Sequence, residues 1–308
     1  MAGVLDVILI VVLLGALGFA GYLLYDSLPG ESVPLISTNQ VPTIEPVYTS
    51  STQFYPNMRF RSERISYSIE SSCSESKRVN AQGAFEILDE RTRLSFYEDN
   101  ENPEITVVCS QLSPSARNER HFVAGEGGPT EILNASDYSI ILEGTFSLYR
   151  DETCDEPHIA LHELLHVLGF DHNTNPRSIL YPTLDCSQTL DNYLIDEIDG
   201  LYTTPSKPDL ELTVLNASKS GRYASFTILV YNRGLADAPN VKLSVFGDDS
   251  FIKEFDLETV SVASRKTLTV TNLNVGRGSE LITFDVDSDQ TIDELREDNN
   301  KQELILAR

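Results

Sequence analysis

The hydrophobic pattern of the chain begins with an uncharged stretch that is mostly apolar. Val7–Tyr25 contains 19 residues without a formal charge. As a helix rising about 1.5 Å per residue, it would span roughly 28 Å, close to the ~30 Å hydrocarbon core of a bilayer. We therefore predict a transmembrane anchor over residues 1–26, followed by a tether over residues 27–58 that is rich in Pro, Ser, Thr and Asn. The alternative is a cleaved signal peptide, although no Lys or Arg stands before Arg59.

In residues 59–204, apolar positions recur with the spacing of a helix in some segments and with that of a strand in others. Arg64–Ile69 alternates apolar and polar positions and predicts a strand, and the β-branched run Ile105–Cys109 predicts another. Between them, Ser76–Arg91 has the spacing of a helix. We therefore expect one domain of helices and strands over these residues.

The last hundred residues have a β pattern throughout, after the short linker Thr203–Pro208. Gly, Asn and Asp turns separate the strand candidates, which are Leu210–Leu215, Ala224–Tyr231, Val241–Phe246, Lys266–Val270 and Leu281–Val286. About 100 residues of this kind predict a seven-stranded, Ig-like sandwich over residues 205–308.

The composition adds information about partners and compartment. The chain has 23 basic and 47 acidic residues, a net charge of −24. This balance argues against nucleic acid as a partner, because phosphate binding needs a basic surface. The four cysteines stand at no metal-binding spacing, and glycosylation sequons begin at Asn134 and Asn216. Together with the anchor, they predict a single-pass protein of the cell membrane whose two domains are extracytoplasmic.

The chemistry is concentrated in the motif HExxHxxGxxH, which runs from His162 to His172. Residues four apart share one face of a helix, so His162 and His166 can bind one ion. Gly169 lets the backbone leave the helix and bring in the third histidine. Three protein ligands leave a fourth position for water, which is typical of a catalytic Zn²⁺ site. Glu163 is placed to act as general base.

Alternatives to a peptidase of broad action remain open. One is a surface adhesion or scaffold protein in which the zinc fold is inert, although the presence of Glu163 argues against it. Another is a peptidase that trims one dedicated membrane neighbour. His158, four residues before the first ligand, is expected in the first turn of the helix or, alternatively, on the substrate side of the site.

The motif and its surroundings resemble the matrixin branch of the metzincin metallopeptidases. Ser178–Pro182 is similar to the family's Met-turn, with Leu180 in the place of the methionine, and Asp196–Tyr202 looks like the start of its last helix. The resemblance covers about residues 59–204. It implies an α+β catalytic domain with a twisted mixed sheet and an active-site helix, one catalytic zinc ion and peptide substrates. Asn173 departs from the family, which usually has Ser or Thr after the third histidine.

The resemblance also implies how the cysteines pair. Cys73 would bond Cys109, because the family places the neighbouring strands side by side. Cys154 would bond Cys186 and clamp the active site from both flanks. Free buried thiols are the alternative.

Peptide substrates are expected to lie extended along an edge strand of the sheet, pairing with it as an added strand. The segment Gly127–Leu133 is our candidate for this strand. Gly128 and Thr130 are the residues whose substitution would test it.

The C-terminal sandwich has a resemblance of its own. Pro208–Leu210, Tyr231–Gly234, Ile292–Glu294 and Asp298–Asn300 resemble motifs of the cell-adhesion-related (CARDB) domain of bacterial and archaeal surface proteins. This implies binding of a cell-surface ligand.

Calcium is the further metal that we considered for the sandwich. Asp285, Asp287 and Asp289 have a suggestive spacing, but Gln290 stands where an EF-hand needs Gly, and Arg296 where it needs Glu. We therefore expect a solvated acidic loop here, and calcium has no support from the motif.

Overall fold

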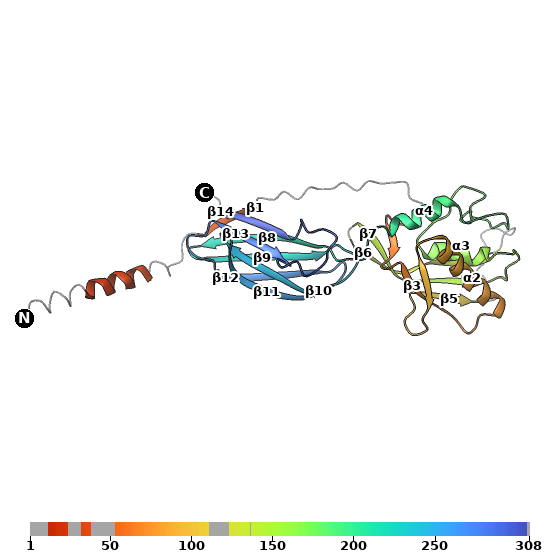
Figure 1. Ribbon diagram of the computed structural model, residues 1–308, viewed down its shortest axis with the longest axis horizontal. Helices are drawn as coiled ribbons and strands as arrows, with labels where there is room; N and C mark the ends of the chain where they lie inside the picture. The colour runs from red at the N-terminus through yellow and green to blue at the C-terminus, as the bar shows by residue number, and fades with distance from the viewer. Residues whose placement is uncertain (1–11, 24–31, 38–52, 111–122, 136, 307–308) are drawn as a thin grey trace, which may run out of the picture. The chain divides into compact units, whose positions relative to one another are not determined.

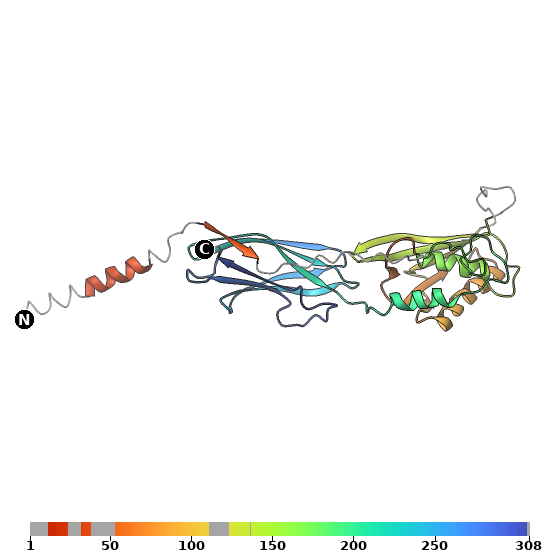
Figure 2. The same cartoon turned by 90° about the horizontal axis from the view of Figure 1, so that it is seen from above.

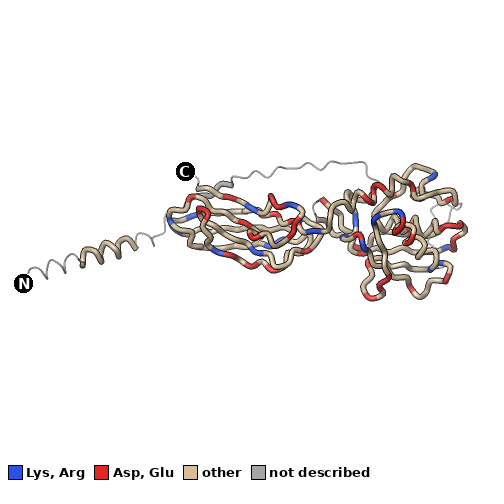
Figure 3. The backbone as a smooth tube through the Cα atoms, viewed as in Figure 1, with Lys and Arg blue, Asp and Glu red and all other residues tan. Residues whose placement is uncertain are grey.

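The computed structural model describes residues 12–23, 32–37, 53–110, 123–135 and 137–306. The chain divides into two compact units, which we describe separately (Figure 1). The mixed unit comprises Ile44–Lys207 with Arg233–Ala236. The β unit comprises Met1–Thr43, Pro208–Asn232 and Asp237–Arg308. Figure 3 shows acidic residues spread over both units.

The predicted anchor lies only partly within the described residues. Residues 12–23 form a helix with exposed side chains. No helix among the described residues is long and apolar enough to cross a bilayer. Residues 1–11 and 24–26 of the prediction lie outside the described residues.

The mixed unit is built on a six-stranded sheet. Its strands are β2 (Met58–Phe60), β3 (Arg64–Ile69), β4 (Ser95–Glu98), β5 (Ile105–Cys109), β6 (Gly125–Ala135) and β7 (Tyr138–Leu148). The order β2-β7-β5-β3-β4 is parallel throughout, and β6 pairs antiparallel with β7. Since β2 and β5 occupy the opposite side of β7, β6 is an edge strand of the described sheet.

Helices α2 (Glu75–Arg91), α3 (His158–Val167) and α4 (Asn192–Leu201) share one hydrophobic core with this sheet. Figure 2 shows the helices and strands of this unit from above. Helix α2 begins after Ser74, whose side chain accepts a hydrogen bond from the Lys77 N–H. The predicted helix 76–91 and the predicted strands 64–69 and 105–109 are confirmed, with the helix one residue longer at its start.

The β unit is a sandwich of two antiparallel sheets. Its strands are β8 (Leu210–Ser220), β9 (Tyr223–Asn232), β10 (Ala238–Gly247), β11 (Ser250–Val260), β12 (Arg265–Asn274), β13 (Leu281–Val286) and β14 (Lys301–Leu306). One sheet has the order β8-β9-β12 and the other β11-β10-β13-β14. Strand β9 alternates buried and half-buried residues along its whole length, as a strand with one face in a core must. The five predicted strands lie in β8, β9, β10, β12 and β13, whereas β11 and β14 were missed.

An eighth strand corrects the prediction of a continuous tether. β1 (Ser32–Ser37) pairs with β8 through residues 32–34 and with β14 through residues 35–37, so it joins the two sheets. The tether prediction is also wrong from Gln53 onward, because Gln53 forms a bridge to Phe170. A strand added to an existing edge is held by backbone hydrogen bonds, which the composition of the segment does not reveal.

Candidate metal centre and active-site cleft

The structure brings the three motif histidines together. His162 Nε2 lies 3.0 Å from His166 Nε2 and 3.2 Å from His172 Nε2, and the last two atoms are 3.3 Å apart. The first two side chains come from α3, four residues apart. His172 arrives after Gly169, whose φ of +95° is unfavourable for other residues. A Cβ at Gly169 would also lie 2.6 Å from two atoms of Met58, so only glycine fits this helix exit.

The geometry of this triad fits a zinc ion. Tetrahedral ligands at 2.0–2.1 Å from zinc stand about 3.3–3.4 Å from one another, close to the spacing of the three Nε2 atoms. Among the described residues, these three histidines are the group that can hold a metal ion. The Nδ1 atoms of His162 and His166 lie 2.6 Å from the carbonyl oxygens of Ile179 and Phe170. Donation of Nδ1–H to these oxygens leaves each Nε2 lone pair free for metal.

Burial keeps the triad in the neutral form that binds metal. The pKa of His162 is lowered to about 3, mainly by burial and less by the neighbouring His166, while a hydrogen bond to the backbone acts in the opposite direction. The pKa values of His166 and His172 are also lowered, mainly by burial. Protons therefore compete weakly with a metal ion for these nitrogens at neutral pH.

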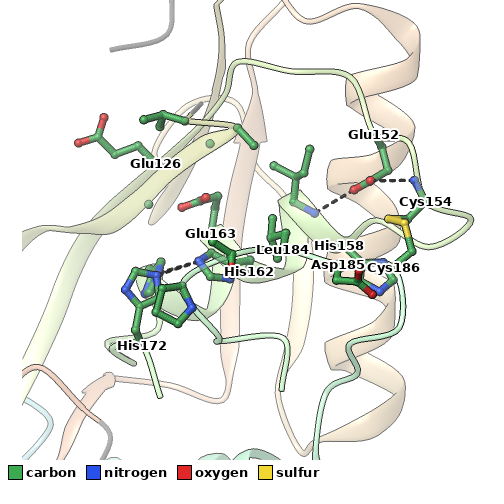
Figure 4. A pocket seen from close by; sticks show the side chains of 18 of the residues that line it. Glu126, Glu152, Cys154, His158, His162, Glu163, His172, Leu184, Asp185 and Cys186 are labelled. Carbon is green, nitrogen blue, oxygen red and sulfur yellow. Dashed lines mark hydrogen bonds between the residues drawn. A yellow bond between two sulfur atoms is a disulfide. The ribbon is translucent and has the colours of Figure 1, made fainter. Parts of the chain in front are cut away.

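Glu163 lies beside the triad, between α3 and the edge strand β6 (Figure 4). Its residue is only 5% exposed. Burial raises the pKa of Glu163 to about 8, with a smaller contribution from the charge of Glu126, while a backbone hydrogen bond from Gly127 lowers it. A carboxyl group whose pKa is raised above its usual range suits a residue that must both take up and return a proton.

Two glycines let β6 approach α3 closely. A Cβ at Gly127 would lie 2.2 Å from the Glu163 carbonyl oxygen, and one at Gly125 would lie 2.6 Å from the Glu163 Cγ. Strand and helix could not pack this way with side chains at either position. The sequence Gly-x-Gly in a strand is the signal for this close approach, and the periodic patterns of the chain did not predict it.

The turn at Leu180 lies under the site, as the resemblance implies. Leu180 is fully buried, and the preceding Ile179 supplies the carbonyl for His162. Asn173 takes part in this turn: its N–H donates to the Leu180 carbonyl at 3.0 Å, and its Nδ2 donates to Ser178 Oγ at 2.7 Å. Asn173 differs from the family's usual Ser or Thr, but it is also polar. Its hydrogen bonds connect the backbone next to His172 to the turn.

The two disulfides have the pairings that the resemblance implies. Cys73 bonds Cys109, and Cys154 bonds Cys186. Both cysteines of the second bridge line the cleft (Figure 4). Near them, the Glu152 carboxylate accepts the N–H of Ile159 at 2.9 Å and so caps α3, which has no side-chain cap from its own N-cap residue.

His158 takes the expected place in the first turn of α3 and is buried. Its Nδ1 lies 3.0 Å from the Glu156 carbonyl oxygen, and its Nε2 lies 2.9 Å from that of Gln188. The ring thus links the start of the active-site helix to the loop after Cys186. His158 also borders the cleft. It therefore lies both in the first turn of the helix and on the substrate side of the site, the two places considered from the sequence.

The cleft has a volume of about 730 Å³. On the β6 side, Val123–Gly127 line it, whereas Gly128 and Thr130 do not. Of the candidate substrate segment Gly127–Leu133, Gly127 lines the cleft, and the pairing of this strand with β7 shifts between Pro129 and Glu131. The structure also adds a lining residue that we had placed in the tether, Phe54.

The acidic loop of the β unit differs from the triad. Asp287 is buried, and its carboxylate accepts the N–H groups of Thr291 and Ile292 at 3.1 and 2.8 Å. It therefore caps a turn. Within the described residues, Asp285, Asp287 and Asp289 do not gather into a metal-binding group.

Comparison with known families agrees with both halves of this description. Residues 59–203 match the matrixin family, and residues 207–304 match the CARDB family. The chain therefore combines a matrixin-like domain with a CARDB-like sandwich. No curated protein matches the chain.

Two solved structures are similar to parts of this chain. The CARDB domain of a Pyrococcus furiosus protein in complex with di-metal ions is 23% identical with a TM-score of 0.27, over 32% of this chain and 88% of that chain. High choriolytic enzyme 1, a hatching enzyme zinc-protease from Oryzias latipes, is 23% identical with a TM-score of 0.24, over 35% of this chain and 44% of that chain.

Proposed function

We propose that the mixed unit is a zinc-dependent endopeptidase of the matrixin type. The observation that carries this proposal is the triangle of Nε2 atoms, 3.0–3.3 Å apart, with the buried carboxyl of Glu163 beside it. His162, His166 and His172 would hold the ion. Three protein ligands are typical of a catalytic zinc, whereas a structural zinc has four.

Glu163 is the general base and then the proton donor. Zinc, when bound, supplies a Lewis acid that polarises the scissile carbonyl and makes water acidic enough to ionise near neutral pH. The Glu163 carboxylate takes the proton of the attacking water and returns it to the leaving amine nitrogen. The N–H of Gly127 holds this carboxylate at the cleft, and the missing side chain at Gly125 leaves room for it.

The substrate is a peptide that lies extended along the outer edge of β6. The stretch Val123–Gly127 borders the cleft, and β6 pairs only with β7 among the described strands. An extended peptide can form backbone hydrogen bonds with such an edge, which would hold it across the site without regard to its side chains.

We further propose that residues 1–26 anchor the protein in the cell membrane and that both units face the extracytoplasmic side. Two disulfides support an oxidising compartment. The CARDB-like unit would bind a cell-surface ligand and so hold the peptidase near its substrates. The orientation is tested by tagging the C-terminus and treating intact cells with an added protease. Loss of the tag supports an extracytoplasmic location, and a protected, intracellular tag would contradict it.

The test of activity compares the full chain with Glu163→Gln, which keeps the shape of the side chain, and with His162→Ala, which removes a ligand. Zinc content and cleavage of an unbiased peptide library are measured for all three. We expect about one zinc per chain in wild type and in Glu163→Gln, and cleavage by wild type that exceeds that by Glu163→Gln at least 100-fold. His162→Ala should lose both zinc and cleavage.

Two other outcomes of this test would favour the alternative functions. If wild type holds zinc and cleaves nothing, the peptidase proposal fails and the adhesion or scaffold function takes its place. If wild type cleaves one protein of the same membrane and no library peptide, the enzyme is a dedicated trimming peptidase.

A further inference from the structure

The segment before the predicted domain boundary is docked at the exit of the active-site helix. The Phe54 N–H donates to the Gly169 carbonyl oxygen at 2.9 Å, and Gln53 forms an antiparallel bridge with Phe170. The side chain of Gln53 also bonds the backbone of Met58 twice, at 2.6 and 3.1 Å. These contacts fix Phe54 at the C-terminal end of α3.

The Phe54 ring borders the cleft beside the metal site. Its centroid is 5.9 Å from that of the His166 ring, and the residue is 40% exposed. It lines the same cavity as His166, His172 and Glu163. Tyr55, the next residue, is 55% exposed but does not line this cavity. An aromatic ring that is held rigidly and left partly open offers a large apolar surface to a bound ligand.

Phe54 lines the cavity near the C-terminal end of α3, where its N–H bonds Gly169. The Cys154–Cys186 bridge, which lines the same cavity, precedes and follows α3 in the chain and lies near Glu152, which caps the start of α3. Helix α3 has 10 residues and is therefore about 15 Å long. An extended peptide, at about 3.3 Å per residue, covers this length with four or five residues. Its side chains thus meet Phe54 on one side of the scissile bond only.

We propose that Phe54 forms a specificity subsite for an apolar side chain of the substrate, at one position a few residues from the scissile bond. The inference rests on the peptidase function proposed above. It makes the segment Gln53–Asn57 part of the enzyme, although sequence patterns assigned it to the tether.

The test uses the full chain and a peptide library read by mass spectrometry, which gives the preference at each substrate position. In wild type we expect apolar side chains to be favoured at one position on one side of the cut. Phe54→Ala should lower kcat/KM about tenfold for such peptides, mainly through KM, and leave peptides with glycine at that position unchanged. Phe54→Leu, which keeps an apolar side chain, should retain most of the preference.

Tyr55→Ala is the matched control, because it removes a neighbouring exposed ring outside the cleft. It should cleave like wild type. Zinc content and thermal unfolding of each variant show whether the site is intact.

Three results would overturn the inference. Phe54→Ala could keep the wild-type preference, or it could lose kcat equally on all peptides, which is what a purely structural role beside His166 predicts. Loss of zinc in both Phe54 variants would have the same meaning. If wild type itself cleaves no peptide, the proposed peptidase function is wrong, and the subsite proposal is wrong with it. This outcome differs from the other three, in which wild type is active.

Discussion

A single methyl group at Gly125 should disable the general base and leave the metal site intact. A Cβ at this position lies 2.6 Å from Glu163 Cγ and 2.8 Å from its Oε1. Ordinary van der Waals contact begins at 3.4 Å, so the Gly125→Ala variant must move these atoms by about 0.8 and 0.6 Å. The clash involves the base and none of the three histidines. A displacement near 1 Å in an active site costs about 100-fold in rate, so we expect kcat to fall between about 10- and 100-fold.

The assay measures kcat on a cleaved library peptide together with zinc content, which should stay near that of wild type. Gly200→Ala is the comparison, because a Cβ there has no atom within 4 Å. It adds the same methyl group to α4, outside the cleft, and should lose less than about threefold. An undiminished kcat in Gly125→Ala would refute this prediction, and so would an equal loss in Gly200→Ala. Zinc loss in Gly125→Ala would show that the strand positions the ligands rather than the base.

Three further predictions concern stability. Replacing both Cys154 and Cys186 by Ser should lower the free energy of unfolding by about 3–4 kcal/mol, because the bridge closes a loop with a sequence separation of 32; calorimetry of wild type and variant checks this. The Lys77 ammonium donates to three backbone carbonyls at 3.0–3.3 Å. Lys77→Met leaves them unpaired and should cost about 2–4 kcal/mol by denaturant unfolding; a loss under about 1 kcal/mol would contradict it. Burial raises the pKa of Glu294 from 4.5 to about 7. The folded state then binds this proton more tightly than the unfolded chain, so stability should fall as the pH rises from about 4.5 to 7, by at most about 2 kcal/mol once solvent screening is allowed for. Thermal melts across this range should show the slope in wild type and a flatter profile in Glu294→Gln.

Sequence patterns predicted those elements whose periodicity comes from burying one face. Arg64–Ile69 and Leu281–Val286 coincide with β3 and β13. Strand β11 was missed because most of its residues are exposed or half-buried, so its apolar residues do not alternate. Strand β1 was missed because its pairing uses backbone groups, which every residue has.

The candidate site also has a part that the sequence predicts and a part that it does not. The sequence by itself determined that His162 and His166 share a helix face next to Glu163, because helical geometry couples residues four apart whatever surrounds them. Only the tertiary structure decided how the cleft is completed. Gly125 meets Glu163 because two elements pack closely, and Phe54 reaches the site through backbone bonds to residues more than 100 positions away. Such contacts depend on shape and on backbone pairing, neither of which leaves a periodic pattern in the chain.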